Sequence, residues 1–193
     1  MQIQDEWENR YQNKQMGWDR GAASPALLAW LESGDLQPCR ILIPGCGLGH
    51  EVVELARRGF EVTAIDIAPS AIRHLQEVLT RESLSANVIF GDLFEYTARQ
   101  PFDAIYEQTC LCALPPHTLE TYEARLYEWL RPGGQVLAMF MQTGKEGGPP
   151  FHCDIQAMQV LFSQDRWQWS DAPIDVVDHP SGRHELARVL KRR

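Results

Sequence analysis

The stretch ILIPGCGLGHE, residues 41–51, constrains the fold of this 193-residue chain more strongly than any other segment. An apolar run without polar alternation leads directly into Gly45, Gly47 and Gly49, and a helix-like pattern follows. Such a run is typical of a strand that is buried on both faces. Glycines at alternate positions after it indicate a turn whose bare backbone can approach a ligand closely. Residues 45–49 are called the glycine loop below.

Strand-like and helix-like segments alternate along the chain. This alternation predicts an α/β fold: a Rossmann-like, doubly wound, mostly parallel seven-stranded sheet with helices on both faces. Three strand-like segments close the chain, RWQWS, IDVVD and HELARVL, and two or three of them are expected to form strands, with a hairpin at the sheet edge. The other strands are expected at 39–44, 61–66, 87–94, 102–111 and 134–141, and the helices at 50–60, 70–82, 119–130 and 154–162.

Length and composition exclude several classes of protein. The length predicts a single domain over residues 1–193. The formal net charge is −8, from 26 acidic and 18 basic residues, so the chain would repel a nucleic-acid backbone. It holds no apolar run near the roughly 20 residues that span a bilayer and no signal peptide. Five cysteines without zinc-type spacing favour thiols in a reducing cytoplasm. We expect no nucleic-acid, membrane or metal partner, and a monomer is compatible with the sequence.

The glycine loop by itself leaves its ligand open. A dinucleotide fingerprint reads G-x-G-x-x-G, whereas here the third glycine comes one position early, at Gly49, and His50 follows. The phosphate-binding loop that ends in Gly-Lys-Ser/Thr is also absent. The spacing is compatible with a purely structural turn or with a ligand that carries no pyrophosphate.

Two carboxylates after the next strands favour an adenosyl ligand. Asp66 ends the second expected strand, where a carboxylate can accept both hydrogens of a ribose diol, and Ser70 is better placed to cap the following helix. Asp92 follows the third strand and could accept from an adenine amine while Leu93 packs on the ring, although Asp92 alone could equally be a turn residue. Together with the glycine loop, these positions predict an adenosyl site at the carboxyl ends of the strands.

Aromatic residues are frequent before the first strand. Trp30 shares an apolar helical face with neighbouring leucines, so we expect it in the core. Trp7, Tyr11 and Trp18 stand instead in a polar segment that does not bury them by itself. Large amphipathic rings in such a segment either form a lid over a pocket or pack against the sheet edge.

With these residues identified, the chain resembles the class I S-adenosylmethionine-dependent methyltransferases. Within that group it is similar to the thiopurine methyltransferase superfamily, and most of all to its thiol/halide methyltransferase branch. The resemblance runs from about Trp7 to Phe151. It is carried by WENRYQNKQMGWDRGAASP, LIPGCGLGHEV, IDIAPSAI, GDLFEY, FDAIYEQTCLCALPP, LRPGG and EGGPPF.

This resemblance implies a cofactor and the residues that bind it. The cofactor is S-adenosyl-L-methionine, the product is S-adenosyl-L-homocysteine, and an N-terminal helical lid lies within residues 1–34. The aromatic lid residues would cover the cofactor, the glycines would approach its methionine portion, and the end of the fourth strand would face its amino acid moiety. The implied cofactor-binding residues are Trp7, Tyr11, Trp18, Gly45, Gly47, Asp66, Ile67, Asp92, Leu93 and Glu107.

The chain departs from the family pattern at three positions. Tyr11 stands where the branch often has a second tryptophan, and Glu107 stands where it often has aspartate. Gln108 lies near the place of an arginine in the thiopurine enzymes, which argues against thiopurines themselves as substrates.

The resemblance also implies methyl transfer by in-line displacement to a small soft nucleophile, namely a thiol, hydrosulfide, halide or chalcogen oxyanion. Such acceptors need no general base in the transfer step, and the sequence shows no convincing base pair of residues, so no certain catalytic residue is assigned. Trp18, Tyr106 and Phe151 are candidate residues of the acceptor pocket. Cys110 and Cys112 are expected to pack or line passively.

Two other functional classes use a similar sheet. A nicotinamide-dependent Rossmann oxidoreductase is disfavoured by the position of the third glycine and by the lack of an obvious hydride-relay pair. A non-catalytic module that binds the adenosyl cofactor would keep the same loop and the same aromatic segment.

Overall fold

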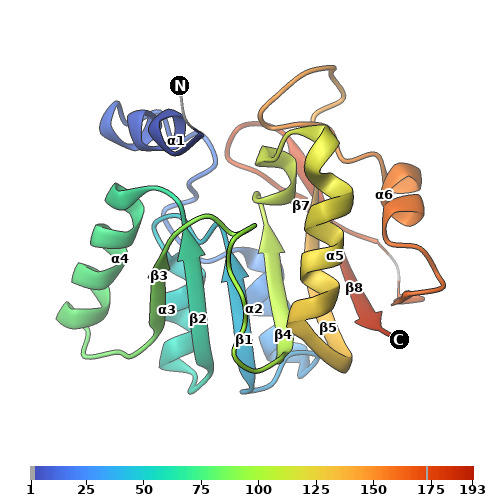
Figure 1. The fold of residues 1–193 in the computed structure, drawn as a ribbon, viewed down its shortest axis with the longest axis horizontal. Coiled ribbons are helices and arrows are strands. Elements are labelled where there is room, and N and C mark those ends of the chain that lie inside the picture. Colours follow the sequence, from blue (N-terminus) through green and yellow to red (C-terminus); the bar gives the residue numbers. More distant parts are fainter. Residues whose placement is uncertain (1–2, 173) are drawn as a thin grey trace. The chain divides into compact units, whose positions relative to one another are not determined.

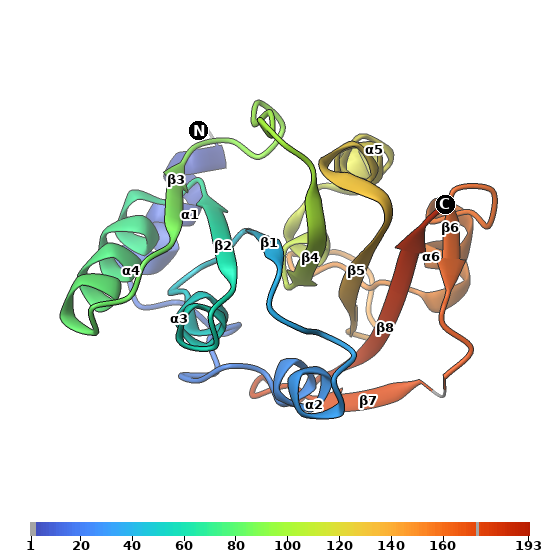
Figure 2. The same ribbon diagram turned by 90° about the horizontal axis from the view of Figure 1, so that it is seen from below.

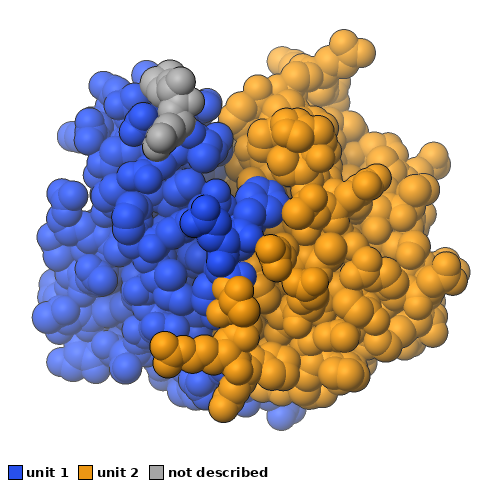
Figure 3. Space-filling view, in the orientation of Figure 1, with its two compact units in different colours: residues 1–96 blue, residues 97–193 orange. Residues whose placement is uncertain are grey.

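The computed structural model describes residues 3–172 and 174–193, so Met1 and Gln2 of the predicted lid segment lie outside the described residues. The chain divides into two compact units, residues 1–96 and residues 97–193 (Figure 3). Each unit is described in turn. No helix in the described part of the chain is long and apolar enough to cross a membrane.

Unit 1 is a βαβαβ arrangement preceded by two helices (Figure 1). Its strands are parallel, in the order β3-β2-β1. The connections from β1 to β2 and from β2 to β3 advance in the same direction across these strands. Because such connections are right-handed, α3 and α4 lie on the same face of the strands (Figure 2). The elements are α1 (Ile3–Gln12), α2 (Pro25–Ser33), β1 (Arg40–Pro44), α3 (His50–Arg57), β2 (Glu61–Asp66), α4 (Pro69–Arg81) and β3 (Asn87–Phe90).

Unit 2 is built on a mixed set of strands. β4 and β5 are parallel, β8 runs antiparallel to β5, and both β6 and β7 pair antiparallel with β8. Its elements are β4 (Phe102–Gln108), η1 (Leu111–Ala113), η2 (Pro116–Thr118), α5 (Leu119–Trp129), β5 (Leu130–Gln142), α6 (Ile155–Leu161), β6 (Trp167–Trp169), β7 (Asp175–Asp178) and β8 (His184–Arg192).

The predicted α/β class with mostly parallel strands is confirmed, whereas the predicted number of strands is wrong. The described residues contain eight strands rather than seven, because all three closing segments form strands and β8 pairs with β5, β6 and β7.

Three strand boundaries also differ from the prediction. β3 ends at Phe90 rather than at residue 94, because residues 92–95 form a turn. β4 ends at Gln108 rather than at residue 111, because Thr109 has a positive φ of 57° that turns the chain out of the strand. β5 begins at Leu130 rather than at residue 134. Leu130 pairs with Phe102, and the register of the ladder then shifts, so the Arg-Pro-Gly-Gly segment runs within the strand instead of before it.

Local sequence signals account for two of the helix starts. Ser24 caps α2 by accepting a hydrogen bond from the amide of Ala26, and a proline opens the helix. Asp154 caps α6 by accepting from the amides of Gln156 and Ala157. On α2, Trp30 is 8% exposed, which confirms its expected place in the core.

Aromatic packing dominates the core of unit 2. Phe162 lies with its ring centre 6.0 Å from Phe140 and 5.6 Å from Trp167, and all three side chains are 1% exposed or less. The indole of Trp167 donates to Glu123. The guanidinium groups of Arg166 and Arg192 each lie 4.1 Å from the ring centre of Tyr127.

Phe162→Ala should lower the free energy of unfolding by about 3–5 kcal/mol, because it removes a large buried side chain and leaves a cavity between two other rings. Urea denaturation measures this change. Val160→Ala is the control, since Val160 is 79% exposed near the same end of α6 and its truncation should change stability little. Equal effects of the two substitutions would contradict the assigned core.

Candidate cofactor site and acceptor-side residues

The glycine loop connects β1 to α3 in a conformation that requires glycine. Gly45, Gly47 and Gly49 have positive φ angles of 59°, 55° and 78°. A Cβ on Gly49 would also overlap the side chain of Leu75 on α4. The third glycine therefore permits close packing of α4, although it comes earlier than in a dinucleotide fingerprint.

Aromatic side chains from the lid segment lie directly on this loop. A Cβ on Gly47 would lie 3.3 Å from the Tyr11 hydroxyl and 3.9 Å from Nε1 of Trp18. The ring of Trp18 meets those of Trp7 and Tyr11 edge-on, at centroid distances of 5.5 and 5.6 Å. Tyr11 and Trp18 thus lie against the backbone of Gly47, and Trp7 packs on Trp18; these three residues are called the aromatic cluster below.

Asp66 connects the glycine loop to the start of α4. Its Oδ2 accepts a hydrogen bond from the amide of Gly47, and its Oδ1 accepts from the amide of Ala68, both at 2.9 Å. Burial raises the pKa of this carboxyl group, while the amides of Ala68, Gly47 and Ile67 act in the opposite direction. A carboxylate has about four acceptor positions on its two oxygens.

The predicted capping role of Ser70 is wrong. The N-cap residue of α4 is Ala68, which offers no side-chain cap, and Ser70 lies inside the first turn. The amide and the hydroxyl of Ser70 both donate to the carboxylate of Glu8 on α1, at 2.9 and 2.6 Å. The cap of α4 thus comes from a distant helix, which no local pattern predicts.

Asp92 forms the turn that follows β3. Its Oδ1 accepts from the amide of Phe94 at 2.8 Å, and its carbonyl oxygen accepts from the amide of Glu95. The turn role that the sequence left open for Asp92 is therefore present. Leu93 beside it is partly exposed, as is Ile67 after β2.

The lid segment is also tied to the start of α3. Nε2 of His50 lies 2.8 Å from Oδ1 of Asp19, and Oε1 of Glu51 accepts from the amide of Ser24 at 3.0 Å. His50 is the first residue of α3, so its contact with Asp19 joins the lid segment to the start of this helix.

In unit 2, Glu107 is the buried acid at the end of β4. It is 1% exposed, and its Oε1 accepts from the amide of Leu111 at 2.6 Å and from the hydroxyl of Tyr122 at 3.5 Å. Its Oε2 is buried without a hydrogen-bond partner among the described residues. Burial raises the pKa of Glu107 to about 8; the Leu111 amide opposes this shift and the nearby charge of Glu185 adds to it.

Gln108 links β4 to β8. Its Oε1 accepts from the hydroxyl of Tyr106 at 2.8 Å, and its Nε2 donates to Oε2 of Glu185 at 3.0 Å. Tyr106 is 1% exposed, so this candidate wall residue is deeply buried in the structure. Glu185 is fully buried and was missed at the sequence level, although it alternates in phase with the buried Ala187 along β8.

The loop that follows β5 is held against η1. The amide of Phe151 donates to the carbonyl of Cys112 at 2.6 Å, and the amide of Cys153 donates to the carbonyl of Met141 at 2.9 Å. Phe151 itself is partly exposed. A Cβ on Gly148 would meet the Phe151 ring at 2.7 Å, so the glycine permits this folding of the loop.

The buried cysteines of unit 2 are poor nucleophiles. Burial raises the pKa of Cys153 to about 12 and raises that of Cys112 well above its ordinary value. A thiol rather than a thiolate therefore stands at each position near neutral pH. This favours the packing role predicted for Cys112.

In unit 1, a strand, the glycine loop and a helix are followed by a carboxylate at the end of the next strand. Aromatic side chains lie on the glycine loop. This arrangement fits an α/β protein that binds an adenosyl cofactor. These features, with the resemblance of their motifs, indicate the class of S-adenosylmethionine-dependent methyltransferases. A family model described as thiopurine S-methyltransferase (TPMT) matches residues 2–190. The chain belongs to the thiopurine S-methyltransferase family and is an S-adenosylmethionine-dependent methyltransferase.

Individual relatives agree with this assignment. The chain is 30% identical over 159 residues to thiocyanate methyltransferase 1 of Arabidopsis thaliana, covering 81% of this chain and 70% of that protein. It is 28% identical over 182 residues to thiopurine S-methyltransferase of Vibrio parahaemolyticus, covering 84% and 83%.

A solved structure supports the fold. The 1,6-didemethyltoxoflavin-N1-methyltransferase of Burkholderia thailandensis, with bound S-adenosylhomocysteine, has a TM-score of 0.79 to this chain at 20% identity, covering 98% of this chain and 87% of that one. The comparisons do not favour an oxidoreductase or a non-catalytic module.

Glu107→Gln should flatten the dependence of stability on pH. The pKa of Glu107 is raised in the folded protein, from an ordinary 4.5 to about 8. Between these two pH values, the carboxyl group is protonated in the folded state and ionised in the unfolded state. The free energy of unfolding of the unmodified protein should therefore fall as the pH rises from 5 to 8, by about 2–4 kcal/mol more than in the variant. Chemical denaturation at four pH values measures the difference, and parallel profiles would contradict the assignment.

Proposed function

We propose that this enzyme transfers a methyl group from S-adenosyl-L-methionine to a small soft nucleophile: a thiol, hydrosulfide, halide or chalcogen oxyanion. The observation that carries the cofactor assignment is the bare backbone of Gly47, covered by the aromatic cluster and fixed by Asp66. The acceptor class is supported by relatives named for thiocyanate, thiol and thiopurine substrates. Gln108 in place of the family's arginine argues against thiopurines themselves.

The residues of unit 1 fit an adenosyl cofactor. Asp66 is proposed to accept from the ribose hydroxyls with the second lone pairs of its oxygens, next to Ile67. Asp92 and Leu93 are proposed to frame the adenine, with the unused Oδ2 of Asp92 as the acceptor. Gly45 and Gly47 are proposed to approach the methionine portion, beneath the rings of Trp7, Tyr11 and Trp18.

Glu107 is the cofactor-binding residue proposed in unit 2. Its buried Oε2 has no hydrogen-bond partner in the part of the chain that the structure describes, and a buried carboxylate oxygen of this kind is stabilised by a cationic donor such as the cofactor's ammonium group. A nearby cation would favour the ionised carboxylate and lower the pKa of Glu107.

The chemistry places few demands on the protein. When bound, the cofactor supplies a methyl group already activated on a sulfonium, and the enzyme aligns the acceptor and excludes water. The aromatic cluster would exclude water, and its ring faces would stabilise positive charge. Trp18, Tyr106 and Phe151 are the proposed acceptor-side residues, and no residue is assigned as a general base.

We further propose that residues 1–193 form one methyltransferase domain, and that it works in the cytoplasm. The family match spans both compact units, which supports a single domain. None of the five cysteines, all within the described residues, takes part in a disulfide bond, as suits a reducing compartment.

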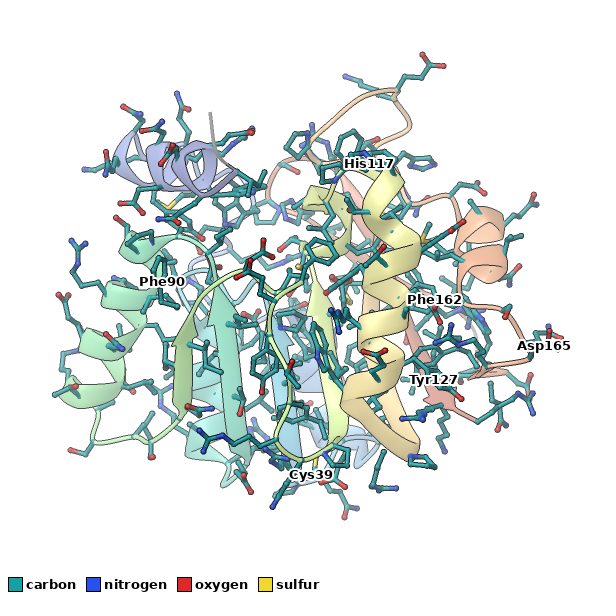
Figure 4. The ribbon with its side chains drawn as sticks, viewed as in Figure 1. Cys39, Phe90, His117, Tyr127, Phe162 and Asp165 are labelled. Atoms are coloured by element: carbon teal, nitrogen blue, oxygen red, sulfur yellow. The ribbon has the colours of Figure 1, made fainter. Side chains whose placement is uncertain are left out.

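Asp66→Ala should weaken the binding of S-adenosylhomocysteine by at least about tenfold, because it removes a bidentate acceptor of the ribose and releases the amide of Gly47. Calorimetric titration measures the affinity, and a thermal melt confirms that the variant is folded. Asp165→Ala is the control, since Asp165 is an exposed acid in the loop after α6 (Figure 4). Unchanged affinity in the Asp66 variant would remove the ribose assignment.

A labelled methyl donor should pass its methyl group to at least one member of a panel of hydrosulfide, small thiols, iodide, thiocyanate, selenite and tellurite, with little transfer to thiopurines. Scintillation counting of the products measures transfer. Tight binding of S-adenosylhomocysteine without transfer to any acceptor would favour a non-catalytic module. Binding of nicotinamide nucleotides instead of S-adenosylhomocysteine would contradict the proposed function.

A further inference from the structure

Helix α1 has little apolar anchorage. None of its described residues falls in the buried class, although it carries Trp7 and Tyr11, which belong to the aromatic cluster. These two residues are four positions apart and therefore share one face of the helix. A surface helix without a buried stripe depends on specific polar contacts to keep one orientation.

Glu8 provides such a contact. Its two carboxylate oxygens accept from the hydroxyl of Ser70 at 2.6 Å and from the amide of Ser70 at 2.9 Å. Gln12, one turn along α1, donates to Glu8 at 3.0 Å and orients it. Both views of the ribbon show α1 beside the first turn of α4 (Figures 1 and 2).

The first turn of α4 is suited to receive this carboxylate. Ala68 at the N-cap contributes no side-chain acceptor, so the amide of Ser70 would otherwise lack a capping group. The positive end of the helix dipole also favours a negative charge there. Burial raises the pKa of Glu8, but the hydrogen bonds from Ser70 and Gln12 and the charge of Arg73 outweigh this and lower the pKa overall, so the carboxylate is ionised near neutral pH.

We propose that Glu8 is a positioning residue, which caps α4 from α1 and thereby holds Tyr11 against the glycine loop and Trp7 against Trp18. The inference rests on the proposed function for the identity of the ligand that the cluster covers. Tyr11 and Trp18 lie against Gly47, so a cofactor that reaches this backbone must enter and leave past them. The two hydrogen bonds from Ser70 to Glu8 therefore break and re-form in each catalytic cycle.

The rest of the lid segment provides the hinge. Gly17 and Gly21 have no atoms within 4 Å of an added Cβ, so the chain between α1 and α2 has room to move. Beyond Gly17, the contacts of Asp19 with His50 and of Ser24 with Glu51 fasten the segment to α3. Opening is thus confined to α1 and the few residues after it.

Glu8→Gln tests the proposal by two independent measurements. Without ligand, trypsin should cut after Lys14 several times faster in this variant, because α1 leaves its closed position more often. With ligand, S-adenosylhomocysteine should dissociate about 5- to 20-fold faster, the range expected from loss of a charged helix cap. The KM for S-adenosylmethionine should rise, while kcat stays level or increases because product release is eased.

Glu6→Gln is the matched control. Glu6 lies on the same helix and loses the same charge, but its carboxylate pairs within α1, with Arg10 at 3.1 Å. Ser70→Ala should reproduce part of the effect, Ser70→Thr should restore the hydroxyl and the slower rates, and Glu8→Gln with Ser70→Ala should be no worse than Glu8→Gln alone.

Equal rates for Glu8→Gln and Glu6→Gln in both measurements would overturn the proposal. If neither the unmodified protein nor any variant binds S-adenosylhomocysteine, the proposed function is wrong. The rate of trypsin cleavage after Lys14 still decides the role of Glu8 in that case. If Glu8→Gln does not fold, the comparison of Ser70→Ala with Ser70→Thr gives the same decision.

Discussion

The contact on which unit 1 depends is the carboxylate of Asp66. It holds the amide of Gly47 with one oxygen and the amide of Ala68 with the other, so a single buried side chain joins the turn after β1 to the helix after β2. Burial raises the pKa of Asp66, and the hydrogen bonds from these amides oppose that shift without cancelling it. Asp66 stabilises the shape of the glycine loop by accepting from the amide of Gly47, and Tyr11 and Trp18 lie against the same backbone.

Unit 2 uses buried polar groups in a different way. Glu107, Gln108 and Glu185 lie near the end of β4 and on β8, with hydrogen bonds that satisfy most but not all of their atoms. Two buried acids near one another raise the cost of ionising either one, and the charge of Glu185 adds to the raised pKa of Glu107. Burial also raises the pKa of the thiols of Cys112 and Cys153, so both are protonated near neutral pH.

Structural features that depend on short-range sequence patterns can be predicted from the sequence, whereas contacts between residues far apart in the sequence cannot. The strand, the glycine loop and the start of the helix at His50 follow from local periodicity and agree with the structure, whereas the helix ends at Arg57 rather than at residue 60. Ser70 was misassigned because its partner Glu8 stands 62 positions earlier and belongs to a helix of low apolar content. The early start of β5 was missed because Arg-Pro-Gly-Gly has the composition of a turn, yet pairing of Leu130 with Phe102 overrides it. The candidate cofactor residues came from motif resemblance, whereas the network around Glu185 needed the fold.

The aromatic cluster has an optical consequence. The rings of Trp7 and Trp18 meet edge to face with their centres 5.5 Å apart, and both are only partly buried, whereas Trp30, Trp129 and Trp167 lie in the core. Indole emission responds to the polarity of its surroundings and to neighbouring rings. Separation of Trp7 from Trp18 when α1 moves away would therefore change the ultraviolet fluorescence of the protein against the emission of the core tryptophans. The chain carries its own spectroscopic reporter of the state of α1, without any attached dye.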